Sequence, residues 1–159
     1  MSRVFYYTVL VASIVGMNTA LAGWPEVEYA EVRAYYYQPE SNGSEPILTD
    51  GNLHPSVVNK QGTPLDASQV KRLIAALDGQ ATFTEVKCYR PHHAFIFYDR
   101  NHKPVAVAEV CLDCMRSRIT PNSKGRVDYR LVADLLEELK FPLGPAASDA
   151  KIYRANREA

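Results

Sequence analysis

The chain has 159 residues, 47% of them hydrophobic, and its 18 lysines and arginines are balanced by 18 aspartates and glutamates. A chain of this length can bury most of the surface exposed when unfolded, so we expect one globular domain. The charge balance argues against nucleic acid and acidic membranes as partners, because both select a basic surface. A protein partner stays open.

The N-terminal segment differs from the rest and predicts an export signal. Arg3 precedes a mostly apolar run at 4–17, and the small-x-small triplet Ala20-Leu21-Ala22 follows. This order is typical of a cleaved secretory signal, whereas a transmembrane anchor needs about 20 apolar residues. We expect residues 1–22 to be removed after Ala22, leaving a periplasmic or secreted protein that does not insert into a membrane.

The first strand is predicted after Pro25. Apolar and polar residues alternate at the start of the segment from Glu26 to Tyr37, and three tyrosines end it. Alternation and aromatic side chains both favour a half-buried strand. Residues 38–64 are rich in proline and glycine and predict a loop.

Two amphipathic helices are predicted, each with an aspartate at its start. Asp66 can cap the first, and Gln69 occupies the position where a capping box places Glu or Gln. Asp128 starts the second, which ends before Pro142. Apolar residues recur at helical spacing in both segments: Val70, Leu73, Ile74 and Leu77 in the first, and Leu131, Val132, Leu135, Leu136 and Leu139 in the second.

The main β signal lies between the helices. Residues 82–89, 94–98 and 105–110 favour strands, and the polar run from Asp99 to Pro104 predicts a hairpin turn. We therefore predict an α+β domain with an antiparallel sheet centred on this hairpin and two helices packed on one face. The domain spans residues 23–144, and the polar residues 145–159 form a loosely held tail.

Reversal of the chain at this turn brings distant sulfur and imidazole groups together. His92 or His93 then lies opposite Cys111, and Cys88 lies near Cys114. An error of a residue or two in the register does not separate these groups, because neighbouring strands are only about 5 Å apart. All three cysteines of the chain belong to this set.

The set has the composition of a zinc site. Two thiolates in a C-x-x-C pair can hold one ion, and a third cysteine with a histidine completes a Cys₃His set. We predict that Cys88, His93, Cys111 and Cys114 are metal ligands rather than catalytic residues, with His92 as the substitute ligand. Four filled positions indicate a structural zinc site, because catalytic zinc keeps one position open. The expected function is a small exported metal-binding domain without catalytic residues.

Two alternatives remain open for the same cysteines. In an envelope redox protein, Cys111 and Cys114 would cycle between dithiol and disulfide, although residues 115–118 lack the apolar stripe of a following helix. In an interaction module without chemistry, a disulfide would join Cys111 to Cys114, or Cys88 to one of them. An odd number of cysteines then leaves one thiol unpaired.

The segment from Cys88 to Asp99, followed by Val105-Ala106 and by the segment from Glu109 to Cys114, resembles a group of uncharacterised exported bacterial proteins. Those proteins share a Cys-x-x-Pro-x-His segment, a Phe-Tyr-Asp hairpin and a C-x-x-C pair. The resemblance implies a bacterial envelope location and places the shared histidine at His93. It implies no activity.

Overall fold

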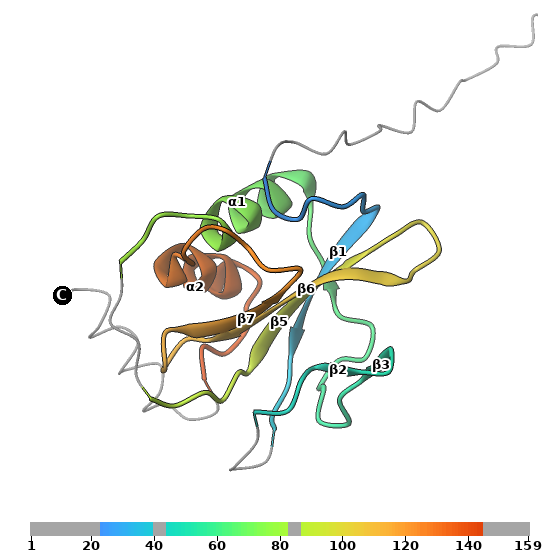
Figure 1. The fold of residues 1–159 in the computed structure, drawn as a ribbon. Helices are drawn as coiled ribbons and strands as arrows, with labels where there is room; N and C mark the ends of the chain where they lie inside the picture. Colours follow the sequence, from blue (N-terminus) through green and yellow to red (C-terminus); the bar gives the residue numbers. More distant parts are fainter. Residues whose placement is uncertain (1–22, 40–43, 83–86, 145–159) are drawn as a thin grey trace, which may run out of the picture.

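The computed structural model describes residues 23–39, 44–82 and 87–144 (Figure 1). The predicted export signal, residues 1–22, and the predicted tail, residues 145–159, lie outside the described residues. Within the described part of the chain, no helix is long and apolar enough to cross a bilayer.

A five-stranded antiparallel sheet with the order β4-β1-β5-β6-β7 forms the centre of the fold, and a two-stranded sheet pairs β2 with β3. Helices α1 and α2 lie together on one side of the large sheet (Figure 1). The predicted α+β fold is confirmed. The elements are β1 Glu31–Tyr36, β2 Leu48–Thr49, β3 Asn52–Leu53, β4 Thr63–Pro64, α1 Ala67–Leu77, β5 His93–Tyr98, β6 Pro104–Cys111, β7 Arg116–Thr120 and α2 Tyr129–Glu138.

Both helices begin where their capping residues predict. The Asp66 side chain accepts a hydrogen bond from the backbone N–H of Gln69, and the Gln69 side chain accepts one from the backbone N–H of Asp66. This reciprocal pair satisfies two donors that an α-helix leaves without partners. At α2, the Asp128 side chain accepts from the N–H groups of Arg130 and Leu131.

The central hairpin has the predicted strands and turn. Strands β5 and β6 are joined through a turn in which the Asp99 carboxylate accepts hydrogen bonds from the N–H groups of Asn101 and Lys103, at 2.8 and 2.9 Å. His93 at the start of β5 pairs with Val110 near the end of β6. One step further along, position 92 lies opposite Cys111, which is one of the two predicted registers.

The structure differs from the predicted elements in three places. The first strand starts at Glu31 rather than Glu26. The predicted strand at 82–89 is not formed by its described residues, 82 and 87–89, and residues 83–86 lie outside the description. The structure adds a strand that the sequence did not suggest: β7, which follows directly after the C-x-x-C pair and pairs with β6.

Strand β5 is buried on both faces, which explains its nearly uninterrupted apolar sequence. Phe95 and Phe97 belong to the core that includes the helices. Ala94 and Ile96 belong to a second core, on the other face, with Ile47. The loop predicted at 38–64 therefore provides packing: its part after residue 44 helps to cover the sheet face that the helices leave open.

Candidate functional site: a three-cysteine centre

The three cysteines converge where β6 ends. Cys111 is the last residue of β6, and the chain then turns through Cys114 into β7. The Met115 N–H donates to the carbonyl of Leu112 at 3.3 Å, and Met115 adopts φ 45°, so the connection between the two strands is a tight turn. Cys88 lies in the segment that precedes β5.

Cys88 and Cys114 form a disulfide, with their Cα atoms 5.5 Å apart. Cys111 is the free cysteine, and all three Sγ atoms lie within 4.8 Å of one another. The predicted juxtaposition of Cys88, Cys111 and Cys114 is confirmed. Their access to solvent differs: Cys88 is exposed, whereas Cys111 and Cys114 are 1% and 2% exposed.

The thiol of Cys111 lies in an environment with opposing effects on its pKa. Burial raises the pKa of this thiol, and the carboxylate of Asp113 raises it further. The backbone N–H groups of Arg90 and Cys114 donate to Cys111 Sγ and, together with the charge of Arg90, work against the rise in pKa. N–H donors of this kind also surround sulfur ligands in metal centres, where they stabilise the thiolate.

The predicted histidine ligand, His93, is not part of the centre. The cluster of possible metal ligands found among the described residues contains the three cysteines alone. His93 pairs with Val110, which lies in the core on the helix side of the sheet. Successive side chains of a strand alternate between faces, so Cys111 projects to the opposite face. The Nε2–H of His93 instead donates to the carbonyl of Pro142 at 2.6 Å.

The substitute ligand, His92, is also outside the cluster. Although its position lies opposite Cys111, its ring is bonded toward β1: Nδ1 lies 3.1 Å from the carbonyl oxygen of Tyr37. The backbone carbonyl of His92 accepts a hydrogen bond from the Tyr37 N–H at 3.0 Å. These two bonds hold His92 against the end of β1.

The redox alternative named Cys111 and Cys114 as the working pair, whereas the disulfide in the structure joins Cys114 to Cys88. Of the disulfide pairings left open by the sequence, the structure therefore has one that spans the start of the hairpin and the turn after it. The C-x-x-C spacing correctly predicted that Cys111 and Cys114 lie close together, but it did not identify which cysteines form the disulfide.

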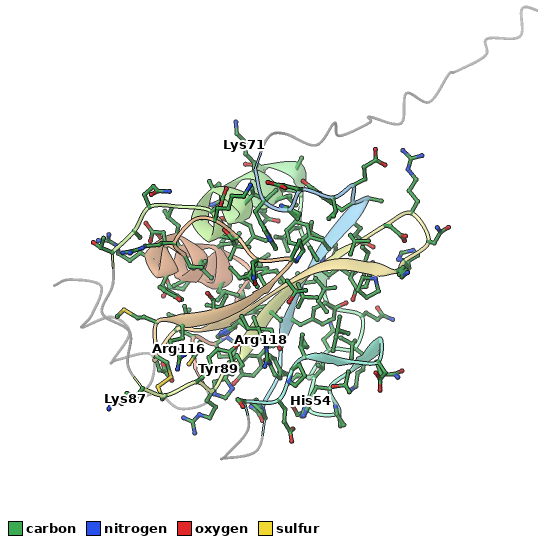
Figure 2. All side chains as sticks on the ribbon, in the orientation of Figure 1. His54, Lys71, Lys87, Tyr89, Arg116 and Arg118 are labelled. Atoms are coloured by element: carbon green, nitrogen blue, oxygen red, sulfur yellow. A yellow bond between two sulfur atoms is a disulfide. The ribbon has the colours of Figure 1, made fainter. Side chains whose placement is uncertain are left out.

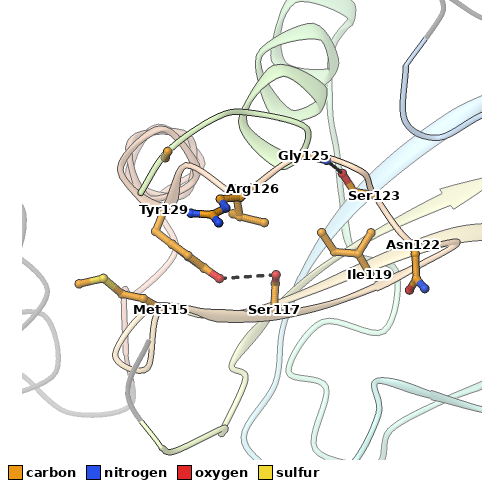
Figure 3. A pocket seen from close by; sticks show the side chains of 10 residues that line it. Met115, Ser117, Ile119, Asn122, Ser123, Gly125, Arg126 and Tyr129 are labelled. Atoms are coloured by element: carbon orange, nitrogen blue, oxygen red, sulfur yellow. Dashed lines mark hydrogen bonds between the residues drawn. The ribbon is translucent and has the colours of Figure 1, made fainter. Parts of the chain in front are cut away.

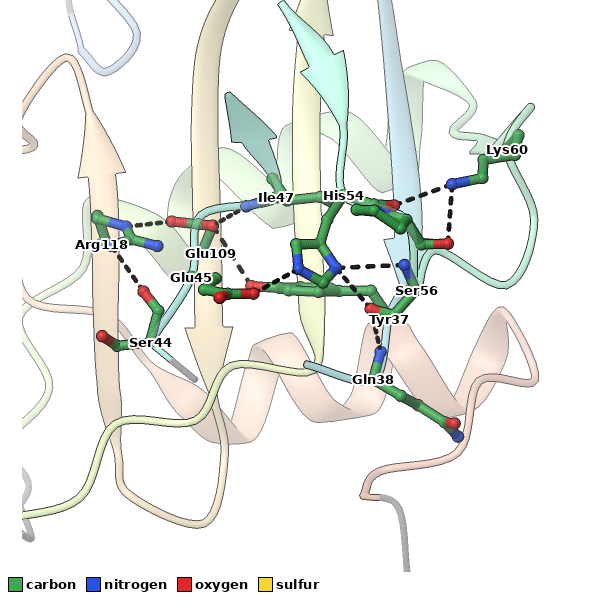
Figure 4. Close-up of polar contacts among 11 residues, drawn as sticks. Tyr37, Gln38, Ser44, Glu45, Ile47, His54, Ser56, Lys60, Glu109 and Arg118 are labelled. Carbon is green, nitrogen blue, oxygen red and sulfur yellow. Dashed lines mark hydrogen bonds and ion pairs between the residues drawn. The ribbon is translucent and has the colours of Figure 1, made fainter. Parts of the chain in front are cut away.

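A buried ion pair lies next to the centre on the same face of the sheet. Glu109, two positions before Cys111, is 2% exposed and accepts from Arg118 Nε and from the Ile47 N–H at 2.5 Å (Figure 4). Tyr37 donates to the same carboxylate at 3.3 Å, and burial, with the negative charge of Glu109, raises the pKa of Tyr37. Sequence analysis did not identify this group, although a glutamate in the otherwise aliphatic strand β6 was a signal.

The covering loop contains a hydrogen-bonded chain from Glu45 through His54 to Ser56. Glu45 Oε2 lies 2.7 Å from His54 Nε2, and His54 Nδ1 lies 2.7 Å from Ser56 Oγ (Figure 4). The residue types match those of a hydrolytic triad. However, the Ser56 N–H also donates to Nδ1, and Ser56 Oγ accepts from the Gln38 N–H. We interpret the chain as a link that fastens the loop to the end of β1.

A pocket of about 580 Å³ lies beside β7, between the sheet and the approach to α2 (Figure 3). Its wall includes the hydroxyls of Ser117 and Tyr129, which are 3.5 Å apart, and the side chain of Arg126. Met115 brings this wall close to the cysteine turn in sequence, but no cysteine or histidine is among the described residues that line it. The pocket and the sulfur centre are separate features.

Comparisons of the chain with protein-family models, with curated proteins and with solved structures gave no match. The candidate function therefore depends on the chemistry of the centre itself.

Proposed function

We propose that this is a small exported metal-binding protein in which Cys88, Cys111 and Cys114, once reduced, hold one ion of the zinc type. The single observation that carries the proposal is the approach of all three Sγ atoms to within 4.8 Å. Zinc–sulfur bonds of about 2.3 Å at tetrahedral angles separate two sulfur ligands by about 3.8 Å. The three cysteines therefore need only a small adjustment to share an ion.

The donor set also fits a thiophilic ion. Three thiolates carry enough charge to bind zinc, and the N–H groups of Arg90 and Cys114 that point at Cys111 favour its thiolate form. Zinc would add Lewis acidity and a cross-link between the start of the hairpin and the turn before β7. Because the cluster contains no histidine, the fourth position on the ion would be taken by water or by a group from a partner.

The oxidised form fits an exported protein. Disulfides persist in oxidising compartments such as the periplasm, and the N-terminal pattern at 1–22 is that of an export signal. In this proposal, the Cys88–Cys114 disulfide is the oxidised, metal-free state of the centre. An external dithiol reduces it by exchange and is itself oxidised to a disulfide, and the released thiols lose their protons when they bind the ion.

Zinc titration of the reduced protein tests the proposal. The protein is purified from the periplasm, reduced without oxygen, and titrated against a chromogenic zinc chelator. We expect one equivalent of zinc in the reduced protein and none in the oxidised protein. Cys88→Ser, Cys111→Ser and Cys114→Ser should each weaken binding at least about tenfold.

Two histidine variants are the controls. His93→Gln should leave zinc affinity unchanged, because His93 is bonded to Pro142 on the other face of the sheet. His102→Gln, at the exposed hairpin tip, tests the effect of losing any histidine. Absence of zinc binding in the reduced protein, or full binding in Cys111→Ser, would overturn the proposal.

A second candidate function is an interaction module stabilised by a disulfide without metal. The Cys88–Cys114 bond is the observation that favours it. The same titration separates the two, since this candidate predicts no zinc in either redox form and one free thiol, Cys111, in the oxidised protein.

A further inference from the structure

The two residues of the disulfide differ in their exposure to solvent. Cys88 is exposed, whereas Cys114 is 2% exposed. In thiol–disulfide exchange, the attacking thiolate must reach a sulfur along the S–S bond, so access decides which of the two is attacked. An external thiol should therefore bond to Cys88 and release Cys114.

Among the described residues, several cations lie near Cys88. Lys87 precedes Cys88 and is exposed, and Arg90 is close enough to act on the Cys111 thiol. Arg116 pairs with Cys111 across the β6–β7 ladder. Figure 2 shows Lys87 and Arg116 at the same end of the molecule as the disulfide, with Lys71 at the other end.

An aromatic ring completes this surface. The guanidinium groups of Arg116 and Arg118 lie 6.0 and 5.4 Å from the centre of the Tyr89 ring, one residue after Cys88. The ring therefore places two cations next to the residue that follows Cys88 in the chain. Negative charge is also present: Asp113 acts on the Cys111 thiol, and Glu109 pairs with Arg118.

We propose that Cys88 is a site of reversible mixed-disulfide formation with small anionic thiols, meaning thiols that carry carboxylates. The thiolate of the small molecule attacks Cys88 Sγ, a new S–S bond forms there, and the Cys88–Cys114 bond breaks. The electron pair of that bond leaves with Cys114, which takes up a proton. One disulfide is exchanged for another, so no further oxidant or reductant is needed.

Cys111 provides a second route by which the small thiol can be released from Cys88. Both Cys111 and the released Cys114 lie beside Cys88. Attack by Cys114 on the mixed disulfide restores the original bond, whereas attack by Cys111 forms a Cys88–Cys111 bond; either attack expels the small thiolate. The inference applies to the oxidised protein and does not depend on the proposed zinc site.

The test uses the oxidised mature protein at low ionic strength with a chelator present, so that zinc has no part in the outcome. Reduced glutathione is the anionic probe, and cysteamine is the cationic one. Samples are quenched with acid and mapped by mass spectrometry. We expect the adduct on Cys88, with glutathione reacting faster than cysteamine after both rates are corrected for thiolate concentration.

Charge variants test the surface. A unit charge about 8 Å away changes the energy of an incoming anion enough in water to alter a rate about twofold. Lys87→Gln should therefore slow the glutathione reaction about twofold, Lys87→Glu should slow it further, and salt should remove the difference. Lys71→Gln, on an exposed position of α1 far from the disulfide, is the matched control and should leave the rate unchanged.

Two results would overturn the proposal: an adduct found on Cys114 or Cys111 rather than Cys88, or equal corrected rates for the two probes. Cys111→Ser should still form the adduct on Cys88 but should not yield a Cys88–Cys111 bond. An unchanged product pattern in that variant would exclude the second route. None of these readouts depends on zinc, so failure here is distinguishable from failure of the proposed metal site.

Discussion

Arg118 on β7 donates to the buried carboxylate of Glu109 on β6, and the backbone N–H of Ile47 donates to the same carboxylate. This relationship joins the third strand of the hairpin system to the loop that covers the sheet. Glu109 lies two residues before Cys111. Its carboxylate therefore links the strand that carries this cysteine to the covering loop.

Removal of the Glu109 carboxylate should destabilise the fold. Glu109→Ala leaves the buried Ile47 N–H without its acceptor, and a buried donor without a partner costs about 1–3 kcal/mol. The Arg118 side chain is partly exposed and also donates to the Ser44 carbonyl, so its loss of Glu109 adds little. Glu109→Gln keeps an acceptor for the Ile47 N–H and should lose less. Urea unfolding of both variants measures the difference. Equal stabilities for wild type and Glu109→Ala would contradict this account.

Reduction of the Cys88–Cys114 disulfide should lower stability by a predictable amount. The bond closes a segment with a sequence separation of 26, and the loss of that constraint in the unfolded chain corresponds to about 3.5 kcal/mol. Urea unfolding with and without a reductant checks the value. Addition of zinc to the reduced protein should then recover stability, because a ligand that binds only the folded state stabilises it.

His93 should make the protein sensitive to mild acid. Burial lowers the pKa of His93 from 6.5 to about 4, so the folded protein keeps this ring neutral where the unfolded chain takes up a proton. Above pH 6.5, the ring is neutral in both states and does not affect the pH dependence of stability. As the pH falls from 6.5 toward about 4, only the unfolded chain takes up this proton, so the free energy of unfolding decreases by about 3 kcal/mol in total.

Unfolding curves across that pH range measure the effect. His93→Gln, which cannot titrate and can still donate to the Pro142 carbonyl, should flatten the dependence. A wild-type stability that is constant from pH 7 to about 4 would show that His93 is not kept neutral by the fold.

Loss of the first helix cap should have a modest and local cost. Asp66→Ala removes the acceptor for the Gln69 N–H and breaks the capping box, which should cost about 1 kcal/mol. Ser68→Ala, at an exposed position of the same helical turn, should change stability by only a few tenths of a kcal/mol. Thermal or urea unfolding compares the two, and similar losses would refute a specific role for the cap.

The sequence pattern predicted the position of the three cysteines but not that of the histidine. Apolar runs on either side of a polar turn predicted the hairpin, and its length brought Cys88 near Cys114. The predicted register did not show that His93 lies outside the cysteine cluster. A shift of one residue moves a side chain to the other face of the sheet, and the predicted register left that shift open.

Strand β7 could not be predicted because its residues, Arg116 to Thr120, are mostly polar. They form a strand because β6 offers a free edge directly after the turn and because Arg118 meets Glu109 across the ladder. The covering loop is a similar case. Its proline and glycine residues predicted an irregular loop and gave no sign that it packs on the sheet. Ile47 and Val57 are core residues because they contact the second face of the sheet.

The sequence by itself determined the local features: two capped helices, a hairpin and the gathering of three cysteines at one end of it. These depend on spacing and on contacts between residues close along the chain. Only the tertiary structure decided which sulfurs are bonded, which thiol is buried and which way each histidine faces. Those outcomes depend on strand parity and on packing between distant segments, neither of which is recorded in the local pattern.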